Sequence, residues 1–293
     1  MTVRLGDNQY GKAQTHVVRV TKSGPDGSVH DIKDMTVSVM LAGDFAGTHL
    51  SGDNSKVVPT DSQKNAVFAL AKESPIGEIE DFALRLAREF VRNHESVQRA
   101  RVTIEEQPWT RITAGGKPHP HAFERAGSEK RLTTVTCRRD SEWVVSGATD
   151  LTLLKTTGSE FWGYPKDRYT ILPETHERVL ATAVDARWRY GRQDVDWHAA
   201  RAETRRLMVE TFATKHSLSL QQTLYAMGEA VLEARPEIAE IRFSMPNKHH
   251  FAVDLQPFGG ENDNEVFYAS DRPYGLIEGT VTRDDAAPAD QAW

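Results

Sequence analysis

Hydrophobic and polar residues alternate in two neighbouring stretches near the start of the chain. The stretches cover residues 15–22 and 34–41, and the alternation is clearest at Val37, Val39 and Leu41. Alternation with a period of two is typical of a strand that buries one face. Turn-forming residues at 24–27 lie between the stretches, so the pattern predicts a β-hairpin.

The next apolar residues recur every three or four positions, which is the spacing of a helix with one buried side. Residues 61–72 carry Val67 and Leu70 at this spacing, and Thr60 or Asp61 precedes them as a candidate cap. A second helix is predicted by apolar residues at Ile79, Phe82, Leu86 and Phe90. Two helices are therefore expected to follow the two strands.

Two further strands are predicted at residues 101–105 and 132–138. Between them, residues 114–121 are rich in Gly, Pro and His, a composition that favours a loop. The first half of the chain is therefore expected to have the order β, β, α, α, β, β.

The second half repeats this order after a junction near residues 141–150. The predicted elements are strands at 143–155 and 179–190, helices at 195–216 and 217–234, and strands at 238–245, 249–256 and 264–282. The last helix carries a stripe typical of core packing, at Leu220, Leu224, Met227 and Val231. The halves share no evident residue pattern, so the division into domains 1–140 and 141–293 rests on element order.

Composition narrows the classes of function. A length of 293 residues suits about two domains, and 39% hydrophobic residues can supply their cores. The chain has 36 Lys and Arg against 42 Asp and Glu, a net charge of -6, which argues against a nucleic-acid partner. An anionic ligand would have to be held by local positive groups.

We expect a cytoplasmic location, because the sequence shows no targeting signal. No stretch reaches the roughly 20 apolar residues of a membrane helix, and the first residues lack a signal-peptide core. The last three residues are not a peroxisomal signal. The single Cys137 favours a reducing compartment, and its alternating surroundings predict a small strand residue rather than a nucleophile.

A polar run near the C-terminus is the strongest candidate for a ligand site. If it is extended, alternation places Asn247 and His249 on one face, followed by Phe251 in apolar surroundings. Such a face could hold a small polar ligand. For this run alone, the simpler interpretation is that Asn247 caps a turn after Pro246 and the histidines are solvated.

Four more segments favour a ligand site over this simpler interpretation. In chain order the five are Asn-Gln-Tyr-Gly-Lys at 8–12, Thr-Asp-Ser-Gln-Lys-Asn at 60–65, Ser-Glu-Phe-Trp-Gly at 159–163, Asn-Lys-His-His at 247–250 and Asp-Arg-Pro-Tyr-Gly at 271–275. Together they closely resemble urate oxidase, and the resemblance runs from about residue 6 to about residue 283. Five separated motifs in one order are far more specific than any one of them.

The resemblance implies the tunnelling fold, which is an α+β architecture. Each subunit would hold two tandem ββααββ domains with antiparallel sheets and helices on one face. Domains from different subunits would pair to close a β-barrel, and two barrels would form a homotetramer with active sites at subunit interfaces. Association of this kind would also cover exposed strand edges.

Urate is a flat anion, so its site should combine an aromatic face, a planar cation and amide groups. The resemblance places Phe161 against the purine ring and gives Arg178 and Gln221 the grip on the pyrimidine side, a fork that Lys could not replace. Without the resemblance, Phe161 would be an ordinary strand-end aromatic, Arg178 a surface charge and Gln221 a first-turn helix residue.

The remaining substrate contacts are also implied by the resemblance. Thr60 and Asp61 match a binding segment at a helix start, where backbone N–H groups favour an anion. Leu172 matches a pocket-lining position, and Leu220 would contact the substrate through its backbone. Asn247 would hold O2, peroxide or the attacking water above the purine plane.

Oxidation of urate by O2 needs a second proton to be removed, because the dianion is electron-rich enough to pass an electron to O2. A Thr60 hydroxyl is too weak to do this alone and needs an amine or imidazole beside it. The resemblance places Lys12 and His249 there. The implied reaction gives 5-hydroxyisourate and hydrogen peroxide, with no metal or organic cofactor.

Two other functions stay open. A zinc-dependent pterin-type enzyme of the same fold would need Cys and His ligands, and the single cysteine argues against it. A non-catalytic purine-binding or assembly protein would be expected to lack Lys12, Thr60 or His249, and all three are present. His119 and His121 could bind a metal, but no carboxylate or Cys completes a recognisable spacing.

Overall fold

The computed structural model describes residues 2–293, which form two compact α+β units. The first contains the chain up to Gly147 together with Pro288–Trp293, and the second is Ala148–Ala287. Each unit has antiparallel strands and its own pair of long helices. Among the described residues, no helix is both long and apolar enough to cross a membrane.

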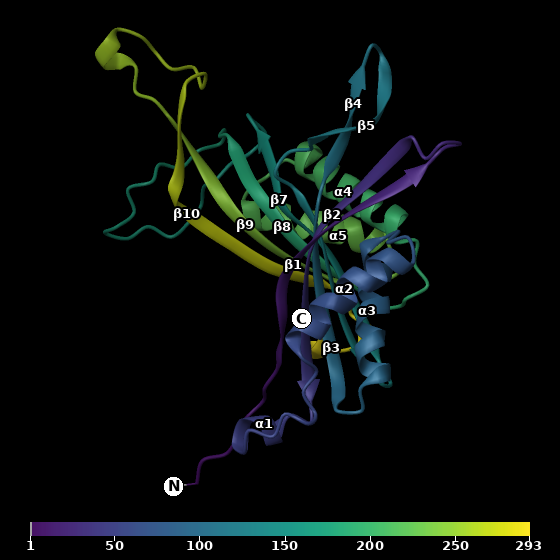
Figure 1. Ribbon diagram of the computed structural model, residues 1–293. Coiled ribbons are helices and arrows are strands. Elements are labelled where there is room, and N and C mark those ends of the chain that lie inside the picture. Colours follow the sequence, from purple (N-terminus) through teal and green to yellow (C-terminus); the bar gives the residue numbers. More distant parts are fainter. Residues whose placement is uncertain (1) are drawn as a thin grey trace. The chain divides into compact units, whose positions relative to one another are not determined.

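The first unit is built on the predicted hairpin. Its strands lie in the order β1 (Tyr10–Ser23), β2 (Val29–Gly43), β3 (Val97–Gln107), β6 (Lys130–Arg138) and the first part of β7 (Glu142–Lys155). The short helix α1 (Ala46–Leu50) precedes α2 (Thr60–Glu73) and α3 (Ile79–Asn93). Helix α3 packs on β3 and β6, while α2 contacts α3 and β1 (Figure 1).

The alternation in β2 produces the core of this unit. Val37, Val39 and Leu41 are almost completely buried, as their period of two predicts. On α3, Phe82 and Leu86 are fully buried on the opposite side of the core. Burying one such side chain contributes about 1.5–3 kcal/mol, so the two matching periods account for the packing of this helix on this sheet.

The second unit has the same kind of construction. The later part of β7 is followed in its sheet by β8 (Leu180–Tyr190), β9 (Ile238–Ala252) and β10 (Phe267–Thr282), with helices α4 (Trp197–Thr214) and α5 (Leu220–Ala234). A short 3-10 turn, Gln256–Phe258, lies in this unit, and a second one, Asp290–Ala292, belongs to the first unit. Helix α5 contacts α4, β9 and β10.

A side-chain cap sets the start of α5, and a glycine allows its close packing on the sheet. The Ser219 hydroxyl accepts a hydrogen bond from the backbone N–H of Gln222, which starts the helix at Leu220. Gly228 faces β10, and a Cβ atom there would lie 2.5 Å from Cγ2 of Val281. The absence of a side chain at Gly228 therefore lets the helix approach the sheet closely.

The predicted loop at 114–121 is wrong. The structure has a two-stranded sheet of β4 (Trp109–Ala114) and β5 (Lys117–Arg125), which projects from the first unit in Figure 1. Gly115 and Gly116 both have positive φ, the combination that a tight hairpin turn requires. The prolines that suggested a loop are tolerated because the sheet has only two strands, both of them edges.

The boundary between the two units, at Gly147 and Ala148, falls within the predicted junction at 141–150 and inside the predicted strand β7. Two other predictions differ from the structure. The strands predicted at 238–245 and 249–256 are one strand, β9. Pro246 fits within β9 because the pairing with β8 is interrupted between Ser244 and Asn247. Neither Thr60 nor Asp61 caps α2, since the cap position is Pro59.

Candidate active site

A cavity of about 680 Å3 in the second unit collects most of the predicted substrate contacts. Six of them line it, namely Phe161, Leu172, Arg178, Leu220, Gln221 and Asn247, and so does the predicted catalytic residue His249. They come from the segments that connect β7 to β8, from the start of α5 and from β9. Residues separated by almost ninety positions in the sequence therefore meet at one hollow.

Strand β9 supplies the polar wall of the cavity. Asn247 and His249 both line it, as expected for alternate residues of a strand. His250 lines it too, although adjacent strand residues were expected to face opposite ways. The pairing of β9 with β10 shifts between Ser270 and Gly275, opposite this run. Such irregularities bend a strand and re-aim its side chains, which explains the departure at His250.

Arg178 is held at the cavity by Ser159. The Arg178 backbone N–H donates to the Ser159 carbonyl at 2.9 Å, and Arg178 Nε donates to Ser159 Oγ at 3.2 Å. Burial lowers the pKa of the guanidinium from its usual value, and an arginine remains a cation nonetheless. Among the described residues it has no carboxylate partner, so its two terminal nitrogens can grip an anionic ligand.

Phe161 is fixed through its backbone and its ring. Its N–H donates to the Thr175 carbonyl at 2.8 Å, and the Thr175 N–H donates back at 3.0 Å. The ring stacks on Tyr164 with centroids 4.9 Å apart and planes 20° apart. These contacts hold an aromatic face at the cavity wall, which suits a flat heterocycle.

The start of α5 forms a further wall. Leu220 is buried, whereas Gln221 is exposed and lines the cavity with its amide. The first N–H groups of a helix have no partner within the helix and carry its positive end. This wall therefore favours a ligand with negative charge or carbonyl oxygens.

His249 is a candidate base on electrostatic grounds. Its pKa is lowered from the ordinary imidazole value, first by burial and then by the positive charges of Arg178 and His250. Its ring stacks on Phe251 with centroids 5.6 Å apart. The neutral imidazole, which can accept a proton, is therefore favoured at neutral pH.

The other predicted residues lie in the first unit. Lys12 is on β1, and its backbone N–H donates to Gln63 Oε1 at 3.2 Å. Gln63 is completely buried, and its Nε2 donates to the Val58 carbonyl at 3.2 Å. Gln63 thereby ties the Lys12 position to the start of α2, where Thr60 and Asp61 lie.

Two neighbours of Lys12 support this arrangement. The Tyr10 hydroxyl donates to the Val58 carbonyl at 3.1 Å and accepts from the Val58 N–H at 2.8 Å. A Cβ atom on Gly11 would lie 1.8 Å from the Val39 carbonyl oxygen, so only glycine fits there. The pairing of β1 with β2 shifts directly after Lys12, which gives that strand a local bend.

Asp61 is exposed and bonded within its own helix. Its carboxylate binds Lys64 and accepts from Asn65 Nδ2 at 3.0 Å. The hydrogen bond from Lys64 is the largest cause that lowers the pKa of Asp61, and the charge of Lys12 acts in the same direction. Lys12, Thr60 and Asp61 are not among the described residues that line the cavity of the second unit.

Several residues of these two sites were not predicted. Gln63 and Ser159 were part of the quoted motifs, but nothing local reveals that they anchor Lys12 and Arg178. The outer part of the cavity also includes Asn264, Phe267 and Ile277. No local signal marks these three: Asn264 lies in the segment between β9 and β10, and Phe267 and Ile277 lie on β10, which pairs with β9.

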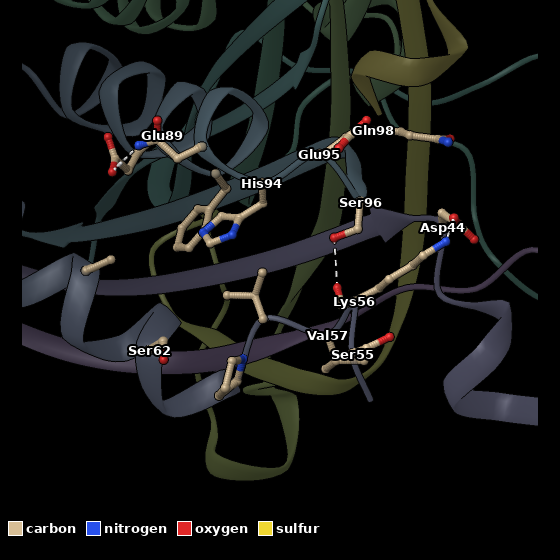
Figure 2. Close-up of a pocket in the computed structure, with 15 residues that line it drawn as sticks. Asp44, Ser55, Lys56, Val57, Ser62, Glu89, His94, Glu95, Ser96 and Gln98 are labelled. Carbon is tan, nitrogen blue, oxygen red and sulfur yellow. Dashed lines mark hydrogen bonds and ion pairs between the residues drawn. The ribbon is translucent and has the colours of Figure 1, made fainter. Parts of the chain in front are cut away.

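The first unit has a hollow of its own, of about 760 Å3 (Figure 2). Lys56 forms an ion pair with Asp44 there, and Ser96 Oγ donates to the Lys56 carbonyl at 2.8 Å. Glu89 and Glu95 also line it, so carboxylates outnumber ammonium groups. This hollow is poorly suited to an anionic substrate.

A metal centre does not emerge from residues 2–293. In that part of the chain, no group of three or more His, Cys, Asp or Glu is arranged to hold a metal ion. His119 and His121 contact each other edge to face with centroids 4.6 Å apart. They lie on β5 in the first unit, whereas His249 and His250 belong to the second.

Comparison with known proteins points to one family. The family model described as Uricase matches residues 8–136 and 144–278. The uricase of Arthrobacter globiformis is 48% identical over 291 residues, covering 99% of this chain and 94% of the relative. The uricase of Oryctolagus cuniculus is 39% identical over 288 residues, with coverage of 96% and 94%.

Solved structures of uricases are also similar to this protein. The crystal structure of uricase from Arthrobacter globiformis superimposes with a TM-score of 0.94 at 48% identity, covering 99% of this chain and 98% of that chain. A uricase from Bacillus fastidious gives a TM-score of 0.81 at 25% identity, with coverage of 95% and 94%. The α+β fold with antiparallel sheets is therefore shared along nearly the whole chain.

Proposed function

The chain belongs to the uricase family, and from that premise we propose that it oxidises urate without a cofactor. The reaction consumes urate, O2 and water and yields 5-hydroxyisourate and hydrogen peroxide. The observation that carries this proposal is the cavity of the second unit, where Phe161, Arg178, Gln221 and His249 converge. An aromatic face, a cationic fork, an amide and a neutral imidazole together complement a flat purine anion.

The substrate is gripped from its edge and its face. Arg178 and Gln221 hold the carbonyl and nitrogen atoms of the pyrimidine side, and Phe161 stacks on the ring. Leu172 lines the apolar side of the cavity, and Leu220 contacts the substrate through its backbone. Asn247 lies on the β9 wall beside His249, from where its amide binds O2, peroxide or the attacking water.

A relay of Lys12, Thr60 and His249 removes the second proton of urate. The Thr60 hydroxyl passes the proton, and Lys12 or His249 accepts it. The lowered pKa of His249 supports this role because a neutral imidazole is the form that accepts. Thr60 and Asp61, at the positive end of α2, help to hold the substrate anion.

We further propose that the site is completed between subunits of a homotetramer. Two tandem tunnelling-fold domains, residues 1–140 and 141–293, would pair with those of a partner to close a barrel, and the partner would supply Lys12, Thr60 and Asp61. Exposed apolar residues on the outer strands support association: Val18 and Val20 on β1, and Tyr268, Tyr274 and Leu276 on β10. A cytoplasmic location remains part of this proposal.

The decisive experiment follows urate by its ultraviolet absorbance after dialysis of the protein against a strong chelator, with peroxide measured in parallel. Full turnover with one peroxide per urate is expected. Turnover that the chelator abolishes and added zinc or copper restores would overturn the cofactor-free reaction. Binding of urate without turnover would favour the purine-binding alternative.

Oligomeric state is measured by sedimentation equilibrium on the same preparation. A tetramer is expected, and an active monomer would overturn completion of the site by a partner subunit. Because association stabilises the folded chain by mass action, the measurement is repeated over a range of protein concentrations.

A further inference from the structure

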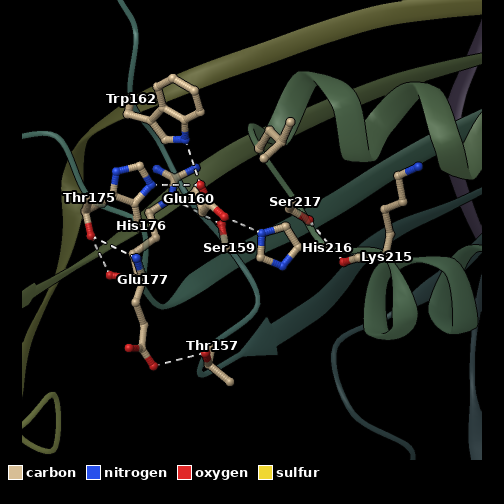
Figure 3. Close-up of polar contacts among 12 residues, drawn as sticks. Thr157, Ser159, Glu160, Trp162, Thr175, His176, Glu177, Lys215, His216 and Ser217 are labelled. Atoms are coloured by element: carbon tan, nitrogen blue, oxygen red, sulfur yellow. Dashed lines mark hydrogen bonds and ion pairs between the residues drawn. The ribbon is translucent and has the colours of Figure 1, made fainter.

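Glu160 lies next to Phe161 but is not among the described residues that line the cavity. Its carboxylate is surrounded by three N–H groups of other side chains (Figure 3). Trp162 Nε1 donates to Oε2 at 2.7 Å, and His176 Nδ1 lies 3.0 Å from the same oxygen. His216 Nε2 lies 2.6 Å from Oε1. Three separate parts of the chain thus meet at one carboxylate.

The backbones of the same segments are also joined. The Glu160 N–H donates to the Ser217 carbonyl at 2.8 Å, and the Ser217 N–H donates to the Gly158 carbonyl at 2.9 Å. These bonds connect the segment before Phe161 to the segment that precedes α5. The Arg178 N–H bond to Ser159 connects it to the third segment.

Ser217 carries the connection on to α5. The Thr223 hydroxyl, on the first turns of α5, donates to Ser217 Oγ at 2.7 Å. Lys155 Nζ also donates to Ser217 Oγ at 2.7 Å and to the Lys215 carbonyl at 2.6 Å. The segment that accepts the backbone hydrogen bond of Glu160 therefore also sets the position of Leu220 and Gln221.

We propose that Glu160 is a positioning residue for the substrate site, holding Phe161, Arg178 and the start of α5 in place through His176 and His216. The proposal rests on the proposed function, because it assigns to Glu160 the geometry of the urate cavity. Glu160 touches no reacting atom in this scheme. It acts through the residues on either side of it and through the two imidazoles.

A carboxylate suits this role. Its two oxygens offer about four acceptor sites, and hydrogen bonds that involve an ionised group are roughly twice as strong as neutral ones. Hydrogen bonds from His176, then His216 and Trp162, lower the pKa of Glu160 to about 2. The carboxylate therefore stays ionised at any pH at which the enzyme would be assayed.

The arrangement differs from a metal site. His176 and His216 address different oxygens of Glu160, so the imidazole nitrogens donate to the carboxylate instead of converging on a common point. In keeping with this geometry, the described part of the chain has no cluster fit to hold a metal ion. The contacts are those of a hydrogen-bonded brace.

The first test compares Glu160→Ala with Glu203→Ala. Glu203 is a matched control because it also pairs with a basic side chain, Arg206, but lies on α4 away from the cavity lining. Glu160→Ala is expected to raise KM for urate at least tenfold while kcat changes less than about threefold. Glu203→Ala is expected to leave both constants unchanged.

The second test uses Glu160→Gln in a pH series. The glutamine oxygen can still accept from Trp162 and His176, but its NH2 group then faces His216, which must accept instead of donate. A neutral imidazole can do this and a protonated one cannot. KM of the variant relative to wild type is therefore expected to be near one at alkaline pH and to rise in acid.

Other charged groups lie around this network. Glu174 lies near His176 and Arg178 near Ser159, while Lys155 donates to Ser217. None of them changes between wild type and Glu160→Gln. The ratio of the two KM values at each pH therefore isolates the contact between position 160 and the imidazoles.

The outcomes separate the two proposals. Absence of urate turnover in the wild type would count against the proposed function. An active wild type with unchanged KM in Glu160→Ala would overturn the positioning role. A variant that is less stable to heat but has normal KM would also overturn it, because Glu160 would then only support the fold.

Discussion

The guanidinium carbon of Arg178 lies 5.2 Å from the centroid of the Phe161 ring. Ser159 holds this pair from one side by bonding the Arg178 backbone and Nε, while Thr175 pairs with the backbone of Phe161. An aromatic face and a planar cation are therefore presented together at one cavity wall. This pairing explains why the fork of Arg178 should matter more than its charge alone.

Arg178→Lys keeps the positive charge and removes the fork. Because lysine is a point charge, it cannot bind two adjacent atoms of a flat ligand side by side. We expect KM for urate to rise at least tenfold with a smaller change in kcat, measured by steady-state kinetics. Arg206→Lys is the control, since Arg206 pairs with Glu203 and Glu210 on exposed α4. Equal effects of the two substitutions would contradict the assigned grip.

Lys12→Met removes the amine from the proposed relay and keeps a side chain of similar length. Proton transfer by a positioned group contributes about 10²–10⁴-fold, so kcat should fall by at least a hundredfold. Urate affinity, measured without oxygen to prevent turnover, should change little. Lys22→Met is the control, because Lys22 is exposed further along β1. A loss of affinity as large as the loss of rate would argue against the relay.

Strong periodicity predicted the fold well. The period of two at Val37 and Val39 and the helical spacing at Phe82 and Leu86 reappear as buried faces because hydrophobic burial drives both elements. The hairpin turn at Gly115–Gly116 was misassigned, since glycine and proline mark loops and tight turns alike. The continuous strand β9 was predicted as two strands because Pro246 interrupted its pattern.

The sequence also predicted part of the site. The motifs identified the cavity residues, and alternation identified Asn247 and His249 as a pair. His250 departs from alternation because the pairing of β9 with β10 shifts beside it. The sequence of β9 alone does not reveal that shift. Gln63 anchors Lys12 across 51 positions of the chain, and no local pattern carries such a contact.

The acid side of the pH profile should report His249. Its pKa is lowered by burial and then by Arg178 and His250, so the imidazole stays neutral below the usual value of about 6.5. As pH falls through this lowered pKa, the base is lost and kcat/KM drops, so the midpoint is expected below 6.5. His250→Asn removes one of the lowering charges and should move the midpoint upward. A midpoint above 7 would contradict this assignment.

Cys137 should be inert in the folded protein. Burial, followed by the neighbouring Glu142 carboxylate, raises the pKa of its thiol to about 12. Because only the thiolate is nucleophilic, iodoacetamide at pH 8 should modify the native protein slowly and the urea-unfolded protein rapidly. The measurement is the mass of the intact chain with time. Native modification at the unfolded rate would show that Cys137 is accessible and ionised.

A buried pair of charged side chains in the first unit provides the last prediction. Glu80 on α3 is fully buried, accepts a hydrogen bond from Ser146 Oγ at 2.5 Å and pairs with Arg131 on β6. Glu80→Ala leaves Arg131 without its fully buried partner, although Glu78 remains 2.5 Å and Glu106 3.7 Å from it. Removing one member of such a pair costs about 3–5 kcal/mol of unfolding free energy.

Urea unfolding at fixed protein concentration measures this cost, with Glu203→Ala as the control, because Glu203 is only half-buried on α4. The double variant Glu80→Met with Arg131→Met should lose less stability than Glu80→Ala, because apolar side chains replace both charges together. If Glu80→Ala cost no more than the Glu203→Ala control, the pair would contribute nothing beyond a surface contact. Such a result would mean that water reaches Glu80 in solution, since only a desolvated charge makes its partner indispensable.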